Sequence, residues 1–224
     1  MTDPAWTSHE KNAAEDAARQ DQRMRKTAKI LIGIGTALIA AAAALTLFNI
    51  WDAYRADRAA REIGNALTQE MDNGFQDKNS DDSGKLQMET ITIDGRKYIG
   101  MLSIPAEDLE LPVQYDWSYE ALRVSPCRYT GSYLTDDLVI CAHNYAKHFS
   151  RIRWLAPGDD IFLRPVDGSQ IHYTVKKLET VQPTDIDDMI ENQSDSGSQW
   201  DLTLFTCNIG GQTRCAVRCH REDE

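Results

Sequence analysis

The stretch that decides the fold is Leu202-Thr-Leu-Phe-Thr-Cys207-Asn-Ile-Gly-Gly-Gln-Thr-Arg214-Cys-Ala-Val-Arg218. Its first part alternates between two sets of side chains, and this period of two predicts a β-strand that ends near Cys207. Gly210 and Gly211 allow the chain to reverse, and a second alternating run begins at Arg214. If the two strands pair as a hairpin, Arg214 returns to the neighbourhood of Cys207. A fixed positive charge beside a thiol favours the nucleophilic thiolate, so the hairpin predicts a reactive cysteine.

A cysteine on a strand is also commonly a small buried hydrophobe, so the interpretation needs a candidate base. His143 meets this need in Leu138-Val-Ile-Cys-Ala-His143-Asn144, where it closes an apolar strand much as Cys207 closes its own. Two reactive side chains at the ends of strands in one sheet can lie close together at the same edge of that sheet. The other histidines compete poorly by position; they are His9, His148, His172 and His220.

The charge balance excludes one class of function. The 224 residues carry a formal net charge of -11, with a sequence pI of about 4.9. A nucleic-acid-binding protein needs a basic face, so this composition argues against one. The length allows one ordinary domain with its own core, together with smaller additions.

Residues 30–51 contain no charged side chain. At about 1.5 Å per residue, a helix of this length crosses a hydrocarbon layer of roughly 30 Å. A buried core helix would carry a broader polar face, and a cleavable signal peptide would have a shorter apolar region. The stretch therefore predicts a retained transmembrane anchor. Basic residues are more numerous before the span than after it, which predicts a cytoplasmic N-terminus and an extracellular remainder.

Four parts follow along the chain. Residues 1–29 form a cytoplasmic tail, and 30–51 form the transmembrane helix. Residues 52–84 combine a helical stalk with a flexible linker, because 72–84 is too polar to bury a core. Residues 85–224 form the folded extracellular domain.

The folded part is mainly β. Short alternating or apolar runs separated by Gly, Pro and Asp predict a closed barrel or sandwich and do not suggest alternating β-α-β units. The expected strands are Met88–Ile93, Tyr98–Ile104, Leu138–His143, Ile161–Arg164, Ile171–Lys177, Leu202–Thr206 and Cys215–Cys219. Short helices are expected at Ser118–Val124, Ala146–Leu155 and Asp185–Glu191.

At this point the sequence resembles the sortases, the membrane-anchored cysteine transpeptidases of Gram-positive bacteria. The resemblance covers most of residues 98–219. It rests on Thr203-Leu-Phe-Thr-Cys207 as the family's TLxTC strand, on Ala142-His143-Asn144 and on Arg214. It implies an eight-stranded β-barrel with short helices, behind an N-terminal transmembrane helix.

The resemblance also implies a mechanism. Cys207 attacks a peptide bond in an LPxTG-like C-terminal sorting motif and forms a thioester, while His143 serves as acid and base. Arg214 binds substrate and stabilises the oxyanion. We also assign Thr206, Ala142 and Asn144 to substrate binding. The partners are surface proteins or pilins and an amine from peptidoglycan or a pilin lysine, and no metal or other cofactor is needed.

Several features depart from the family pattern. Ala142 stands where members usually have Gly, and bulky Phe205 fills the variable position of the TLxTC strand. The segment between Asp185 and Leu202 is too short for the helical insertion of class B, which favours a class A, D or E-like enzyme. Because of Ala142, a second interpretation stays open, in which the protein keeps the barrel fold and binds peptides without catalytic activity.

The remaining cysteines leave two further alternatives open. They are Cys127, Cys141, Cys215 and Cys219. Cys215 and Cys219 are too far apart on one extended strand to bridge each other, although either could meet Cys127 or Cys141. Buried free thiols are the simpler interpretation. A zinc site also stays open, although the spacing of the candidate ligands is that of strands; these ligands are Cys141, His143, Cys207, Cys215, Cys219 and His220.

Overall fold

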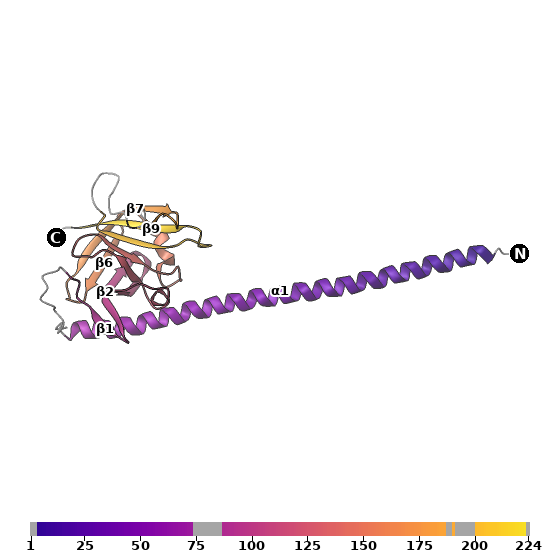
Figure 1. Ribbon diagram of the computed structural model, residues 1–224, viewed down its shortest axis with the longest axis horizontal. Helices are drawn as coiled ribbons and strands as arrows, with labels where there is room; N and C mark the ends of the chain where they lie inside the picture. The colour runs from indigo at the N-terminus through magenta and orange to yellow at the C-terminus, as the bar shows by residue number, and fades with distance from the viewer. Residues whose placement is uncertain (1–3, 74–86, 187–189, 191–199, 223–224) are drawn as a thin grey trace. The chain divides into compact units, whose positions relative to one another are not determined.

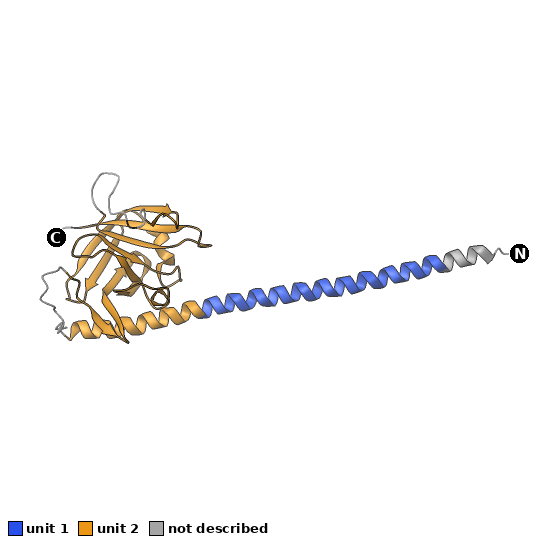
Figure 2. Cartoon of the chain, viewed as in Figure 1, with its two compact units in different colours: residues 1–51 blue, residues 52–224 orange. Residues whose placement is uncertain are grey.

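The computed structural model describes residues 4–73, 87–186, 190 and 200–222. Two compact units divide the chain, residues 1–51 and residues 52–224 (Figure 2). One helix, α1 (Pro4–Asp72), contributes to both. The second unit therefore begins at Asp52, ahead of the start at residue 85 expected from the sequence. The segment expected to be a flexible linker lies mostly outside the described residues.

Unit 1 contains the apolar stretch 30–51 of helix α1. Among the residues searched, one helix has the length and composition of a membrane span, and none of its most apolar window is buried. Ile32 and Ile39, for example, are 69% and 72% exposed. Apolar side chains on all sides of a helix are typical of a segment whose solvent is lipid. The helix therefore fits a single-pass membrane anchor.

Unit 2 contains a closed eight-stranded β-barrel with a ninth strand, β1, paired to β2 at the side (Figure 1). Its sheet runs in the order β1-β2-β3-β4-β5-β8-β9-β7-β6, and β2 also pairs with β6 to close the ring. The strands are β1 (Ile91–Ile93), β2 (Arg96–Ile104), β3 (Leu109–Gln114), β4 (Cys127–Thr130), β5 (Leu138–Cys141), β6 (Asp160–Pro165), β7 (Ile171–Val181), β8 (Leu202–Cys207) and β9 (Arg214–Arg221). The expected eight-stranded barrel is confirmed.

Two of these strands escaped the sequence analysis. Strand β3 contains Pro112, which was interpreted as a turn signal, yet in the structure Pro112 pairs with Met101 of β2. Strand β4 has only four residues and pairs in parallel with β3 at a single position. A strand this short carries too little alternation to be recognised locally.

Short 3-10 helices replace two of the expected helices. They are η2 (Ala121–Arg123) and η3 (Phe149–Trp154), and a third, η1 (Pro105–Glu107), connects β2 and β3. The expected helix at Asp185–Glu191 lies largely outside the described residues. Helix η3 contacts β8 and β9 and buries Phe149 and Ile152 completely. It thereby supports the hairpin that carries Cys207.

Alternation along β8 separates two apolar clusters. Leu202 and Leu204 lie in the large cluster that fills the barrel, together with Val217 of β9. Phe205 belongs to a smaller cluster on the outer face, with Ala216 of β9. By the same alternation, the Cys207 side chain lies on this outer face.

The end of α1 packs against the barrel within unit 2. Ala60 joins the barrel cluster, and Leu67 and Met71 pack with Tyr98 and Val166. Residues at these spacings share one helix face, so apolar burial holds the segment in place. Segment 52–72 of α1 is thus part of the folded unit.

Candidate active site

Cys207 and Arg214 lie directly opposite each other in the β8–β9 hairpin. Cys207 ends β8 and is half-buried, while Arg214 begins β9. Residues paired in an antiparallel ladder place their side chains on the same face, with Cβ atoms about 4.5–5.5 Å apart. The hairpin therefore brings the thiol and the guanidinium together on the outer face, as the sequence pattern predicted.

The turn of this hairpin is held by its own hydrogen bonds. The Asn208 amide donates to the Thr213 carbonyl at 2.9 Å, and the Asn208 side chain donates to the Thr213 hydroxyl at 2.8 Å. Gly210 and Gly211 both have positive φ, 85° and 73°, a conformation that favours glycine. The turn can therefore keep the two strand ends in register.

The turn also orients the Arg214 guanidinium. Its Nη1 donates to the Gly211 carbonyl at 2.9 Å and to the Thr213 carbonyl at 3.2 Å. Nε and Nη2 have no hydrogen-bond partner within the described part of the chain. A planar cation that is fixed at one nitrogen and has free donors at the others suits a developing negative oxygen.

His143 follows β5, the neighbour of β8 on the side away from β9. Strands β5 and β8 run parallel, with Cys141 beside Phe205. The Ala142 amide extends this ladder by donating to the Phe205 carbonyl at 3.3 Å. His143 and Cys207 each stand two residues beyond the Cys141–Phe205 pair, on strands about 4.8 Å apart. The strand order β5-β8-β9 therefore sets the strand that ends at Cys207 between the strand that precedes His143 and the strand that begins at Arg214.

A buried hydrogen bond locks the two strand ends together. The Thr206 hydroxyl donates to the Ala142 carbonyl at 2.8 Å. Thr206 is 1% exposed and Ala142 is 5% exposed, because both side chains face the barrel interior. Their polar groups bind each other and are not open to a ligand. Of the three residues assigned to substrate binding, only Asn144 is partly exposed, in the loop after His143.

The Tyr145 ring contacts the His143 ring, and charged side chains from two further elements act on its imidazole. The Tyr145 ring lies 5.0 Å away between centroids, and its hydroxyl donates to Asp52 of α1 at 2.7 Å. Burial and the positive charge of Arg123 lower the pKa of His143, while Asp52 acts to raise it. The hydrogen bond from Tyr145 lowers the pKa of Asp52 itself, so its carboxylate is charged.

His148 lies deeper in the same loop. It is fully buried, and its ring stands 5.4 Å from Tyr145 between centroids. Neither ring nitrogen has a hydrogen-bond partner among the described residues. Burial lowers the pKa of His148 to about 4, with His143 acting in the same direction. His148 is therefore neutral at pH 7 and cannot replace His143 as a proton donor.

The other four cysteines are free thiols, and all are buried. Cys215 and Cys219 lie in the barrel cluster, whereas Cys127 and Cys141 lie in the outer cluster, paired with each other across β4 and β5. This division places the proposed zinc ligands on opposite faces of the sheet. No group of three or more metal-binding side chains occurs among the residues searched.

Aromatic rings extend the outer cluster away from Cys207. Phe205 meets Tyr129 of β4 edge-on at 5.3 Å, and Tyr129 lies 5.2 Å from Trp117, which is 42% exposed. Val139 and Val181 complete the apolar floor. The site thus combines a thiol, an imidazole and a guanidinium with an apolar surface of the kind that holds an extended peptide.

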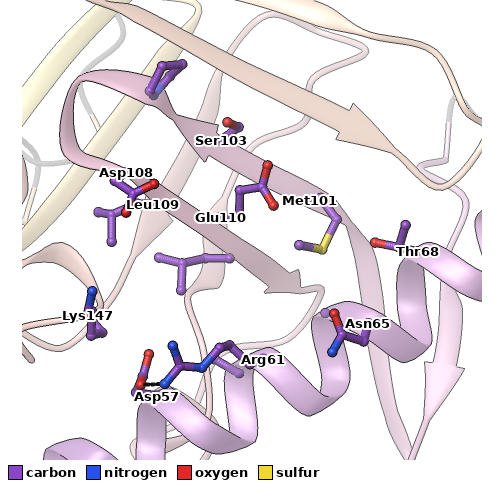
Figure 3. A pocket seen from close by; sticks show the side chains of 14 residues that line it. Asp57, Arg61, Asn65, Thr68, Met101, Ser103, Asp108, Leu109, Glu110 and Lys147 are labelled. Atoms are coloured by element: carbon purple, nitrogen blue, oxygen red, sulfur yellow. Dashed lines mark hydrogen bonds and ion pairs between the residues drawn. The ribbon is translucent and has the colours of Figure 1, made fainter.

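A cavity of about 640 Å³ lies elsewhere, between the α1 segment and strands β2 and β3. The ion pair of Asp57 with Arg61 lines its helix side, and Glu110 lines its strand side (Figure 3). Its described lining contains no cysteine or histidine. The cavity therefore offers neither a thiol nor an imidazole, and the strand ends at Cys207 remain the stronger candidate by chemistry.

Sequence reasoning proposed Cys207, His143 and Arg214 as the site, and it named none of the three side chains that influence His143 in the structure, which are Asp52, Arg123 and Tyr145. Tyr145 follows His143 by two residues, so its proximity had a local signal. Asp52 is 93 positions from Tyr145 in the chain. No sequence periodicity connects residues that distant.

The Sortase domain model matches residues 102–222, more than half of the chain. No curated protein matches the chain significantly. Among solved structures, a Clostridium perfringens sortase D5 transpeptidase has a TM-score of 0.56 at 14% identity, covering 74% of this chain and 99% of that one. At such identity the likeness shows the fold alone.

Two further structures are similar over part of their length. Sortase C from Clostridium perfringens SM101 is 23% identical with a TM-score of 0.49, covering 79% of this chain and 90% of that one. Sortase C1 of GBS pilus island 1 is 23% identical with a TM-score of 0.47, covering 57% of this chain. The match spans 65% of that pilus-island sortase.

Proposed function

The chain belongs to the sortase family, and we propose that it is a membrane-anchored transpeptidase that acts through Cys207. The family implies a cysteine transpeptidase in general. The observation that carries the proposal for this chain is the order His143, Cys207 and Arg214 across three adjacent strand ends. A base on one side and a cation on the other are what a nucleophilic thiol requires.

In the first step, the Cys207 sulfur attacks the carbonyl carbon of the scissile peptide bond. The carbonyl oxygen becomes negative and receives hydrogen bonds from the free donors of Arg214. His143 gives a proton to the departing amine, the C–N bond breaks, and a thioester to Cys207 remains. In the second step, His143 takes a proton from an incoming amine, which attacks the thioester and forms a new amide bond. The C–S bond breaks and Cys207 leaves as the thiolate, so the thiolate and the protonated His143 of the starting state are restored.

The substrate we propose is a protein with an LPxTG-like C-terminal sorting motif. An extended peptide would lie on the outer face, over Phe205 and the ring of Tyr129. The acceptor would be an amine of the cell wall or of a pilin lysine. With α1 as the anchor and its N-terminus in the cytoplasm, unit 2 would meet these substrates outside the membrane.

The test uses the full chain in detergent micelles, an LPxTG-like peptide library and an amine acceptor. Intact mass should show an adduct equal to the acyl fragment, which the amine then removes. Cys207→Ala should show no adduct although it remains folded by circular dichroism. Failure of every motif to give an adduct with the wild type would overturn transpeptidation, and peptide binding without an adduct would support the inactive barrel.

A further inference from the structure

Asp52 of α1 reaches the loop that carries His143. Its Oδ2 accepts the Tyr145 hydroxyl at 2.7 Å, and its Oδ1 binds Arg55 at 3.0 Å. The two bonds fix both oxygens of the carboxylate, one from the barrel loop and one from its own helix. Charge-assisted hydrogen bonds of this kind are stronger than neutral ones, so they restrict the Tyr145 side chain.

The Tyr145 ring stands between two histidines. It lies 5.0 Å from His143 and 5.4 Å from His148, measured between ring centroids. His148 is fully buried and cannot move aside without opening the core. Asp52 holds the Tyr145 hydroxyl at one end, and the buried His148 blocks one side of the ring. Together they keep the Tyr145 ring against the imidazole of His143.

The surroundings of His143 are mixed in charge. The titratable and charged groups that contact it or act on it are Asp52 of α1, Arg123 of η2, and Tyr145 and His148 of its own loop. Burial and Arg123 disfavour the imidazolium, and among these groups Asp52 is the negative charge that favours it. Without Asp52, burial and the charge of Arg123 would both disfavour the protonated His143 ring, with no negative charge to oppose them.

We propose that Asp52 and Tyr145 are positioning residues for His143, holding its ring in place and setting a carboxylate beside it. The inference rests on the proposed function, in which His143 donates a proton to the departing amine. It makes the segment of α1 that follows the apolar span a working part of the site. A protein shortened to the barrel alone would lack this carboxylate.

The direct test is a histidine titration followed by NMR on the full chain in detergent micelles, without any substrate. Labelled ¹³Cε1 histidine gives one signal per ring, and a His143→Gln variant assigns the signal of interest. Asp52→Asn should lower the pKa of His143, whereas Asp52→Glu should keep it close to wild type. Tyr145→Phe, which keeps the ring and loses the hydroxyl, should give a smaller change in the same direction.

A matched control distinguishes the effect of the Asp52 charge on His143 from the effect of weakening the contact between the α1 segment and the barrel. Asp72 lies at the other end of the same α1 segment and pairs with Arg164 at 2.7 Å. Asp72→Asn removes a similar contact with the barrel but places no change near His143. An unchanged His143 titration in Asp52→Asn, or an equal change in Asp72→Asn, would overturn the proposal.

Kinetics supply the second measurement. In Asp52→Asn, the alkaline limb of kcat/KM should move to lower pH, with a loss of about threefold to tenfold near pH 8. The loss should shrink toward pH 6, where the ring is more fully protonated. If the wild type turns over no substrate but Asp52→Asn still changes the titration, the proposed function fails and the positioning of His143 stands.

Discussion

The Thr206 hydroxyl donates a buried hydrogen bond of 2.8 Å to the Ala142 carbonyl, and these residues immediately precede Cys207 and His143. The bond joins the ends of two parallel strands at the point where the ladder stops. It therefore fixes the separation of the proposed nucleophile and base without itself touching a substrate. The TLxTC pattern thus contains a structural threonine as well as the reactive cysteine.

Removing this hydroxyl should damage both stability and activity. Thr206→Val keeps the shape but leaves the buried Ala142 carbonyl unpaired, at a cost of about 1–3 kcal/mol in the free energy of unfolding. We expect kcat/KM to fall by about tenfold or more, because small misplacements of reacting groups are costly. Denaturant unfolding and transpeptidation assays measure the two effects, with Thr206→Ser as the control that retains the hydroxyl. Equal activity of the Val and Ser variants would contradict the positioning role.

Arg214 should act mainly on the chemical step. Arg214→Ala is expected to lower kcat by about 10²–10³-fold, the range for losing one oxyanion donor. Arg214→Lys should restore little, because a single ammonium cannot bind both the turn carbonyls and the substrate oxygen. The control is Arg221→Ala on the same strand, where Arg221 pairs with surface Asp136. Similar losses in both variants would remove Arg214 from the mechanism.

His148 should make stability depend on pH. Folding lowers its pKa from 6.5 to about 4, so the unfolded chain binds a proton at a higher pH than the folded chain does. Stability is then lost as the pH falls from about 6.5 to about 4, by on the order of 3 kcal/mol. Unfolding free energies across this range should show a weaker pH dependence for His148→Leu than for wild type. If the unfolding free energies of wild type and His148→Leu changed equally with pH, His148 would not be a buried neutral histidine.

The five thiols should differ sharply in reactivity. Cys207 is half-buried on the outer face, whereas the other four are buried. Burial raises the pKa of Cys127 to about 12 and raises those of Cys141, Cys215 and Cys219, so their thiolates are scarce at pH 7. Brief treatment of the native chain with iodoacetamide should add one label by intact mass, absent in Cys207→Ser. Two labels added at equal rates would contradict this burial.

The sequence by itself determined the features whose causes are local. The pairing of Cys207 with Arg214 follows from two alternating runs joined by a short glycine turn, because hairpin register depends on neighbours in the chain. The exposed apolar helix that fits a membrane anchor follows from the composition of residues 30–51. The barrel class followed from periodicity and turn residues, whereas the number of eight strands came from the family resemblance, because local patterns did not predict β3 and β4.

Tertiary structure alone decided which of these features meet. The parallel pairing of β5 with β8 brings the strand that precedes His143 alongside the strand that ends at Cys207, and parallel strands have no turn to fix their register. Helix α1 brings Asp52 to Tyr145 because Leu67 and Met71 bury their side chains against the barrel. Both arrangements depend on apolar packing between segments far apart in the sequence, which local pattern does not encode.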